Sequence, residues 1–294
     1  MIKSGLVGVL GQTNVGKSSF INAILGRKLL IVSSKRQSTR AIIRCIYNDP
    51  ESQIVFVDTP GLHRPVDKLS RLLLKQAFAA LRGLDLLLYM IEPWIEIPPY
   101  DQKLFAELQA LPGEKFLLIN KIDRAKGAQV PETIKRYAQT GLFQEFIPIS
   151  CLKKLNLDTT LQLVKRALPE GPRHFPADQP TDRSERFIIA EFIREAVYQY
   201  AQQEVPYSAY VTVNKIERRR GGPVLVQAEI AVSRRSQRGI LIGRGGQMIK
   251  RIGQAARPQI EALLGRPVYL ELEVRLRQDW NRDRRRLLAV LGQR

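Results

Sequence analysis

The chain has 294 residues, enough for about two domains with separate cores, and its 44% hydrophobic and 26% charged residues are typical of a soluble protein. No apolar run approaches the length of a membrane span, and two cysteines are too few for a disulfide framework. The 47 basic and 28 acidic residues give a formal charge of +19, which favours nucleic acid as a partner over an anionic membrane surface. A basic face that serves only solubility is the alternative.

The two cysteines, Cys45 and Cys151, fit a reducing compartment. The opening residues MIKSGLVGVL lead straight into an apolar strand and leave no room for a signal peptide. We therefore expect a cytoplasmic protein.

The first motif follows residues 6–10, an apolar run typical of a buried strand. GQTNVGKSS at residues 11–19 has the GxxxxGKS spacing of a phosphate-binding loop, and residues 19–25 continue as the helix that such a loop opens. Its glycines let the backbone aim N–H groups at phosphate oxygens, to which the helix dipole adds. Lys17 would contact the β and γ phosphates and Ser18 would bind Mg²⁺. The predicted nucleotide contacts are Gly11, Asn14, Val15, Gly16, Lys17, Ser18 and Ser19.

Residues 27–39 are polar and basic without a clear period, which predicts a mobile loop. Two strands at residues 41–47 and 53–57 follow, and the second runs into DTPG at residues 58–61. In phosphate-loop enzymes an Asp at this place holds Mg²⁺, and the glycine N–H senses the γ-phosphate. Alone, DTPG is a common turn. Behind a phosphate loop it predicts a metal contact for Asp58 and a catalytic contact for Gly61.

The next elements alternate between strands and helices, which predicts an open, mostly parallel sheet with helices on both faces and the ligand at the strand ends. The predicted helices are 69–81, 99–111 and 161–168, and the predicted strands are 85–91, 116–119 and 145–149.

NKID at residues 120–123 follows one of these strands. A carboxylate accepts two hydrogen bonds from the guanine N1–H and amino group, which adenine does not offer, so Asp123 would select guanine. Asn120 would reach the imidazole side of the base and Lys121 would cover the ring. A helix start is the alternative, since Asn and Asp are cap residues. The loop at Ser150 and Cys151 would give the guanine O6 a backbone N–H.

Five prolines and glycines within residues 169–180 mark a domain boundary, because helices do not persist through them. We expect an α/β phosphate-loop domain at residues 1–170, a linker at 171–182, and a smaller α+β domain at 183–294. From residue 181 onward, 22 basic and 12 acidic residues make the second domain the more densely basic.

The second domain has the predicted element order αββααβ, with GRGG at residues 243–246 between two helical stretches. A GxxG loop lets a nucleic-acid backbone approach closely, and this order is that of the type II KH module, which binds single-stranded RNA. A bare GxxG usually marks only a turn. The predicted RNA contacts are Ile242, Gly243, Arg244, Gly245, Gly246, Lys250 and Arg251, to which an arginine cluster at 282–286 after Trp280 adds charge.

With both domains in view, the chain resembles the Era family of bacterial GTPases. The likeness spans GQTNVGKSSF, QSTR, VDTPGLH, NKID, ILIGRGGQMIKRIG and GRPVYLELEVRLRQDW. The resemblance implies GTP hydrolysis with Mg²⁺, binding of the 3′ end of small-subunit rRNA, a role in small ribosomal subunit assembly, and peripheral contact with the inner membrane. It implies a monomer, and it identifies Thr39 in QSTR, or Ser38 beside it, as a switch residue that binds Mg²⁺ and assists catalysis.

One departure from common GTPase patterns bears on catalysis. Leu62 follows DTPG where other enzymes place a water-orienting Gln, so we expect slow intrinsic hydrolysis, raised by RNA or by K⁺ bound near Asn14. His63 is set aside as a bystander. A structural RNA-binding protein with a poorly hydrolysing GTP/GDP domain, and a GTPase that acts on another RNA, are the alternatives.

Overall fold

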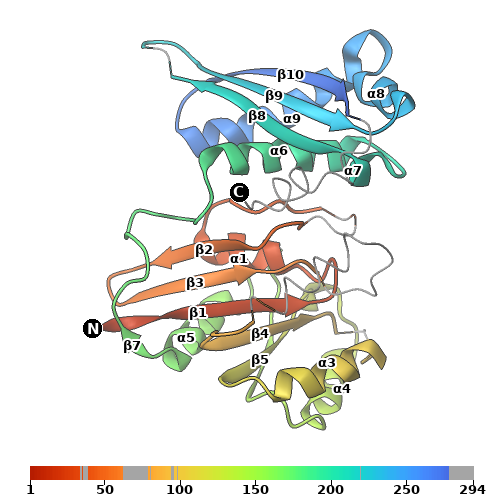
Figure 1. The fold of residues 1–294 in the computed structure, drawn as a ribbon. Helices are drawn as coiled ribbons and strands as arrows, with labels where there is room; N and C mark the ends of the chain where they lie inside the picture. The colour runs from red at the N-terminus through yellow and green to blue at the C-terminus, as the bar shows by residue number, and fades with distance from the viewer. Residues whose placement is uncertain are drawn as a thin grey trace. The chain divides into compact units, whose positions relative to one another are not determined.

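The computed structural model describes residues 1–33, 35, 39–61, 79, 81–93, 96–97, 99–218 and 220–277 (Figure 1). The chain forms two compact units. The first contains Met1–Leu29 and Ala41–Asp182, and the second contains Leu30–Arg40 and the chain from Arg183 onward. The segment between the first helix and the second strand therefore belongs, by its contacts, to the second unit.

The first unit is built on a mostly parallel sheet in the order β2-β3-β1-β4-β5-β6. Only β2 and β7 run antiparallel to their neighbours, β3 and β1. Because the register pairs Val9 with Asp58 and Ile91 with Ile119, the carboxyl ends of four strands meet at one edge. The strands are β1 (Ile2–Gly11), β2 (Ile43–Asn48), β3 (Ser52–Asp58), β4 (Leu86–Ile91), β5 (Glu114–Ile119), β6 (Glu145–Pro148) and β7 (Glu170–Gly171).

Helices cover both faces of this sheet. On one face α1 (Lys17–Leu25) contacts β3 and α5 (Leu157–Ala167), and the rings of Phe20 and Phe56 pack edge to face. On the other face, Phe105 of α3 (Pro99–Gln109) packs against Tyr89 of β4, and Tyr137 of α4 (Gln129–Ala138) packs against Phe105. The predicted α/β fold is confirmed. Helix α4 was not predicted from the sequence, because only Thr133 and Tyr137 of its ten residues are buried.

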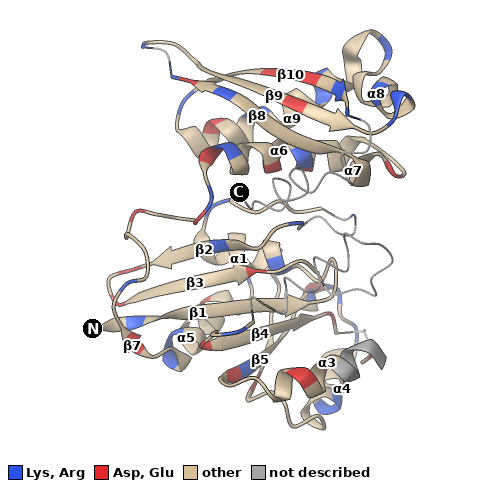
Figure 2. Cartoon of the chain, in the orientation of Figure 1, with Lys and Arg blue, Asp and Glu red and all other residues tan. Residues whose placement is uncertain are grey.

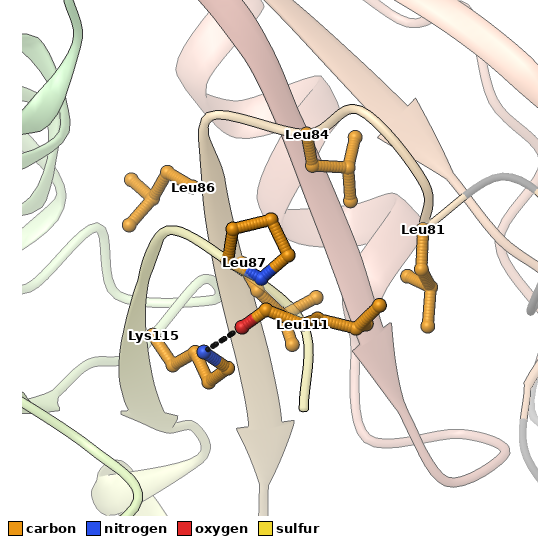
Figure 3. A pocket seen from close by; sticks show the side chains of 7 residues that line it. Leu81, Leu84, Leu86, Leu87, Leu111 and Lys115 are labelled. Atoms are coloured by element: carbon orange, nitrogen blue, oxygen red, sulfur yellow. Dashed lines mark hydrogen bonds between the residues drawn. The ribbon is translucent and has the colours of Figure 1, made fainter. Parts of the chain in front are cut away.

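A small cavity of about 10 Å³ lies where β4 and β5 begin, opposite the edge at which those strands end (Figure 3). Leucines surround it, and the Lys115 Nζ closes it by donating to the carbonyl oxygens of Leu111 and Gly113, both at 2.9 Å. Burial lowers the pKa of Lys115. A space of this size holds at most one water, so it is a packing feature of the core.

The stretch between residues 171 and 182 runs beside β2 and β3 in the first unit. The Ile46 N–H donates to the Pro180 carbonyl at 2.9 Å, and the Gln53 side chain donates to the Phe175 carbonyl at 2.8 Å. The Thr181 hydroxyl donates to the Arg44 carbonyl at 2.7 Å. The proline-rich stretch therefore satisfies backbone groups along the outer edge of the sheet.

The second unit has a three-stranded sheet in the order β10-β9-β8, in which β9 is parallel to β10 and antiparallel to β8. Helices α6 and α9 pack on one face over a shared apolar core. Apart from the short α7, the elements follow the predicted αββααβ order, so this prediction is confirmed. They are α6 (Glu185–Tyr200), α7 (Val205–Ser208), β8 (Tyr210–Glu217), β9 (Val224–Val232), α8 (Arg235–Ile242), α9 (Gln247–Leu264) and β10 (Val268–Leu276).

The described residues of the segment Leu30–Arg40 are anchored in this second unit. Ile31 is buried among core side chains of α6, and the Val32 N–H donates to the Glu195 carboxylate at 2.7 Å. Arg40 is only 4% exposed. Its guanidinium donates to the Tyr198 hydroxyl and to the carbonyl oxygens of Pro206, Tyr207 and Ala209, at 2.8–3.1 Å. The polar, basic composition of residues 27–39 predicted a mobile loop and gave no sign of these contacts of Ile31, Val32 and Arg40.

Three predictions fall on residues outside the described part of the chain: the helix at 69–81 except for its end, Leu62 with His63, and the arginine cluster after Trp280. Within the described residues, no helix is long and apolar enough to cross a membrane.

Candidate nucleotide site and RNA interface

The phosphate loop joins β1 to α1 as predicted. Gly16 has the left-handed φ of 106° and is the N-cap of α1, where no side chain makes a capping hydrogen bond. The start of a helix favours a bound anion. A Cβ on Gly16 would lie 2.2 Å from the Asn120 side-chain nitrogen. That same nitrogen donates to the Val15 carbonyl at 2.8 Å. The phosphate loop and the NKID loop are thus packed directly together.

Lys17 begins α1 and is buried, with 6% of its surface exposed. Its Nζ donates to the carbonyl oxygens of Gly11 at 3.0 Å and Gln12 at 2.8 Å, so the side chain curls back over the loop. Burial lowers the pKa of Lys17 to about 8, and the negative charge of Asp58 opposes this shift. The ammonium of Lys17 is therefore held by carbonyl oxygens at the start of the phosphate loop.

The lowered pKa of Lys17 predicts a pH dependence of nucleotide binding. Below pH 8 the ammonium is already charged, so affinity should be constant there. Above pH 8 the free protein loses this proton while the phosphates hold it in the complex, so the Kd for GDP should rise by up to about tenfold per pH unit. Calorimetry in buffers of different ionisation enthalpy should show uptake of nearly one proton at pH 9. Lys17→Arg, which stays charged, should show none from this residue; equal uptake in both proteins would contradict the assignment.

The metal ligands predicted from the first unit lie together at the same edge. The Ser18 hydroxyl donates to the Asp58 carboxylate at 3.0 Å, across the ends of β1 and β3. A hydroxyl and one carboxylate, completed by phosphate and water, form the oxygen set that Mg²⁺ prefers. Thr59 donates its hydroxyl to the Val9 carbonyl at 2.8 Å, which fixes the chain before Gly61. Gly61 in turn lies against Thr13 of the phosphate loop.

The predicted base-binding residues converge at the ends of β5 and β6. The Ser150 hydroxyl donates to the Asp123 carboxylate at 2.5 Å, which fixes one carboxylate oxygen. Lys121 has a left-handed φ of 66°, and its Nζ donates to the Asn14 carbonyl at 2.8 Å. Asn14 also has a φ of 66°. The lysine therefore bridges the base loop and the phosphate loop.

Cys151 contacts the same cluster through its backbone. Its N–H donates to the Asn120 side-chain oxygen at 3.1 Å, so in this structure it orients Asn120. Burial raises the pKa of the Cys151 thiol to about 12, which leaves the side chain neutral. The assignment of this N–H to the guanine O6 stays a prediction. Ser19 lies half-buried in the first turn of α1.

Thr39 lies in the segment that belongs to the second unit, and it is 8% exposed. Its assignment as a switch ligand of Mg²⁺ stays a prediction, and Ser38 lies outside the described residues. The structure thus joins the phosphate loop, Asp58 and the NKID loop by direct contacts within the first unit, whereas Thr39 belongs to the second unit.

The GxxG loop of the second unit lies between α8 and α9, as predicted. Gly243 has a φ of 72°, and a Cβ there would lie 2.8 Å from the Met248 Cβ, so only glycine fits. Arg244 and Gly245 at the tip are exposed, while Ile242 and Gly246 are half-buried. Such a tip lets a phosphate backbone come within contact of main-chain N–H groups.

Beside this loop, a groove of about 360 Å³ separates α9 from the edge strand β10. Lys250 is among the residues that line it, and its predicted contact with RNA stays a prediction. The side chain of Arg251 instead lies over the Tyr200 ring of α6, 5.0 Å from its centre. The groove is lined by Ile249, Lys250, Gly253, Gln254, Arg257, Val268, Tyr269, Leu270 and Leu272. Apolar walls with basic borders suit a strand of unpaired bases.

Acidic residues gather on β9 and β10, as Figure 2 shows. Glu229 of β9 pairs with Arg275 and Arg277, and Glu273 pairs with Arg275. These pairs neutralise the basic residues at the end of β10. The exposed cations near the GxxG loop, Arg244 and Lys250, are therefore better placed to meet phosphate than the paired arginines of the sheet.

Sequence reasoning missed two sets of residues in these sites. Glu92, just after β4, forms an ion pair with Lys121. Gly253, Gln254 and Arg257 recur on one side of α9 along the groove. The helical spacing of the second set was a usable signal, whereas nothing in the sequence pointed from Glu92 to Lys121.

Two family models match the chain. A 50S ribosome-binding GTPase model matches residues 6–121, and a KH domain model matches residues 201–281.

Similarity to known proteins extends over the whole length. The chain is 44% identical to the GTPase Era of Geobacter metallireducens over 99% of this chain and 97% of that one, and 42% identical to that of Thermotoga maritima with the same coverage. Two solved structures, both 35% identical, cover 99% of each chain. An Aquifex aeolicus Era variant bound to GDP and AlF4⁻ gives a TM-score of 0.92, and Era in complex with MgGDPNP and nucleotides 1506–1542 of 16S ribosomal RNA gives 0.90.

The phosphate loop, the NKID loop and the KH module define the class of this protein as a GTPase that carries an RNA-binding domain. Within that class, the chain belongs to the Era family.

Proposed function

We propose that this protein hydrolyses GTP, binds the 3′ end of small-subunit rRNA through its KH domain, and acts in small ribosomal subunit assembly. The observation that carries the proposal is the similarity, over 99% of both chains, to Era in complex with MgGDPNP and nucleotides 1506–1542 of 16S rRNA. The paired loops at the sheet edge support the nucleotide part, and the groove beside the GxxG loop supports the RNA part.

In this proposal the chain's own groups bind and orient the triphosphate. Lys17 and the N–H groups of the phosphate loop would hold the β and γ phosphates. Ser18, Asp58 and Thr39 would hold Mg²⁺, which would supply positive charge to the reacting phosphate. The Gly61 N–H reports the presence of the γ-phosphate. Asn14 lies at the border of the loop, where a bound K⁺ would add charge in place of a side-chain donor.

Single-turnover hydrolysis tests the enzymatic part. The wild-type protein with GTP and Mg²⁺ should turn over slowly, and an RNA with the rRNA 3′-end sequence, or K⁺ in place of Na⁺, should accelerate it. Lys17→Ala should lose at least about hundredfold in rate, because a charged contact to the transferred phosphate is removed. If the wild-type protein hydrolysed no GTP under any of these conditions, the result would instead favour a structural RNA-binding protein whose nucleotide domain hydrolyses GTP poorly.

If the groove between α9 and β10 binds RNA, filling it should weaken RNA binding. Gly253 faces Leu272 across it, and a Cβ on Gly253 would meet the Leu272 Cδ1 at 3.5 Å, an ordinary contact. Gly253→Leu should fill the groove and weaken binding of the rRNA fragment by about tenfold or more. Gly253→Ala should change it less than about twofold and is the matched control. Fluorescence anisotropy with labelled RNA measures both. Equal affinity for Gly253→Leu and the wild type would place the RNA elsewhere, and crosslinked RNA sequenced from cells would identify another RNA partner.

Cellular location and oligomeric state can be tested separately from GTP hydrolysis and RNA binding. We propose a cytoplasmic monomer that contacts the inner membrane peripherally. Analytical ultracentrifugation tests the monomer, and sedimentation with anionic vesicles tests the membrane contact. A dimer in the centrifuge would contradict the proposed monomer. A lack of binding to vesicles at low salt would contradict the proposed membrane contact.

A further inference from the structure

The residues that follow β4 have no role in the motifs of the nucleotide site, yet they lie at its edge. Ile91 ends β4, and its carbonyl accepts a hydrogen bond from the Asn120 N–H at 2.8 Å. The first residue of NKID is therefore tied to the end of β4. The residue that follows Ile91 therefore starts beside the NKID loop.

That next residue, Glu92, is fixed on both sides. Pro93 after it is buried, and its carbonyl accepts a hydrogen bond from the hydroxyl of Thr133 in α4. Thr133 is itself only 2% exposed, and its single hydroxyl proton is shared with the Gln129 carbonyl oxygen, 2.7 Å from the hydroxyl. Glu92 thus lies on a backbone held by β5 on one side and α4 on the other.

The Glu92 carboxylate pairs with the Lys121 ammonium. The Glu92 side chain is 12% exposed and the Lys121 side chain 27%, so water screens this pair less than it screens a surface pair. The same ammonium donates to the Asn14 carbonyl at 2.8 Å. One lysine therefore joins three segments: the end of β4, the NKID loop and the phosphate loop.

These contacts restrain the side chain of Lys121, which would otherwise have many rotamers. A lysine side chain has four rotatable bonds, and ordering it on binding costs entropy. Lys121 is expected to lay its stem across the guanine ring. If the carboxylate already holds the ammonium, the stem is in place before the nucleotide arrives, and the left-handed backbone at Lys121 is held with it.

We infer that Glu92 is a positioning residue of the guanine site: it holds Lys121 across the base and, through Lys121, fixes Asn14 of the phosphate loop. The inference rests on the proposed binding of guanine nucleotides. It predicts that losing the carboxylate speeds nucleotide release while leaving base selection by Asp123 intact.

A double-mutant cycle tests this inference in the full-length protein. Release of a fluorescent GDP analogue is followed by stopped flow for the wild type, Glu92→Gln, Lys121→Ala and the double variant. Glu92→Gln keeps the size of the side chain and should raise the release rate about tenfold, because a charge-assisted bond is weakened. In the Lys121→Ala background the same change should alter the rate less than about twofold. Glu92→Asp should fall between the wild type and Glu92→Gln.

Glu96→Gln is the matched control, since it removes the same charge from an exposed residue four positions along. It should release the nucleotide at the wild-type rate. Thermal melting of each protein without nucleotide separates loss of fold from loss of positioning. A wild-type rate for Glu92→Gln, or an equal effect of Glu92→Gln with and without Lys121, would overturn the inference. A wild-type protein that does not bind GDP would instead refute the proposed function.

Discussion

Replacing Gly16 with alanine should abolish tight nucleotide binding. The new Cβ would lie 2.2 Å from the Asn120 side-chain nitrogen, and the φ of 106° strains any other residue. Asn120 would have to move, and its bond to the Val15 carbonyl would break. Both the phosphate loop and the NKID loop would shift, so we expect GDP affinity to fall at least about hundredfold, measured by calorimetry.

The matched control for Gly16→Ala is Gly141→Ala. Gly141 also has a positive φ, 63°, but no atom lies within 4 Å of its Cβ position, so this variant carries the backbone strain without the collision. It should lower thermal stability slightly and leave GDP affinity unchanged. Comparable losses of affinity in the two variants would mean that strain, and not the contact between the loops, explains the effect.

Asp123→Asn should exchange the preferred base. The carboxylate would accept two hydrogen bonds from guanine, and an amide in its place presents a donor where guanine also has one. Affinity for GDP should fall by about hundredfold or more, while xanthosine diphosphate, whose oxygen replaces the guanine amino group, should bind the variant better than it binds the wild type. Competition against a fluorescent nucleotide measures both.

Asp178→Asn serves as the charge-matched control for this exchange, because Asp178 is exposed in the stretch beside β2. It should keep the wild-type preference. If Asp123→Asn weakened both nucleotides equally, the Ser150 bond to the carboxylate would be its main role, as a support for the loop.

Much of the fold follows from the sequence because buried parallel strands are continuous apolar runs. The runs at β3, β4 and β5 have fully or almost fully buried residues, which is what a strand covered on both faces requires. Helix α4 was missed for the opposite reason. It buries only Thr133 and Tyr137 among its ten residues, so the apolar signal was weak.

The candidate site was predictable where local motifs carry it, and less so where side chains meet across strands. GQTNVGKSS and NKID could be placed at one sheet edge because parallel strands end together. The Glu92–Lys121 pair depends on which strands are neighbours and on the exact turn after β4. The burial of Arg40 depends on three carbonyl groups far along the chain. Neither pattern has a local signature.

The anchoring of residues 30–40 also limits how the protein can be divided. A fragment that starts at Arg183 would contain α6 through β10 but would lack Ile31, which fills part of their apolar core. It would also leave the carbonyl groups of Pro206, Tyr207 and Ala209 without the Arg40 guanidinium. The RNA-binding unit is thus discontinuous in the sequence: part of its core comes from a peptide about 150 residues before Arg183, so an isolated KH fragment should be more stable when it includes that peptide.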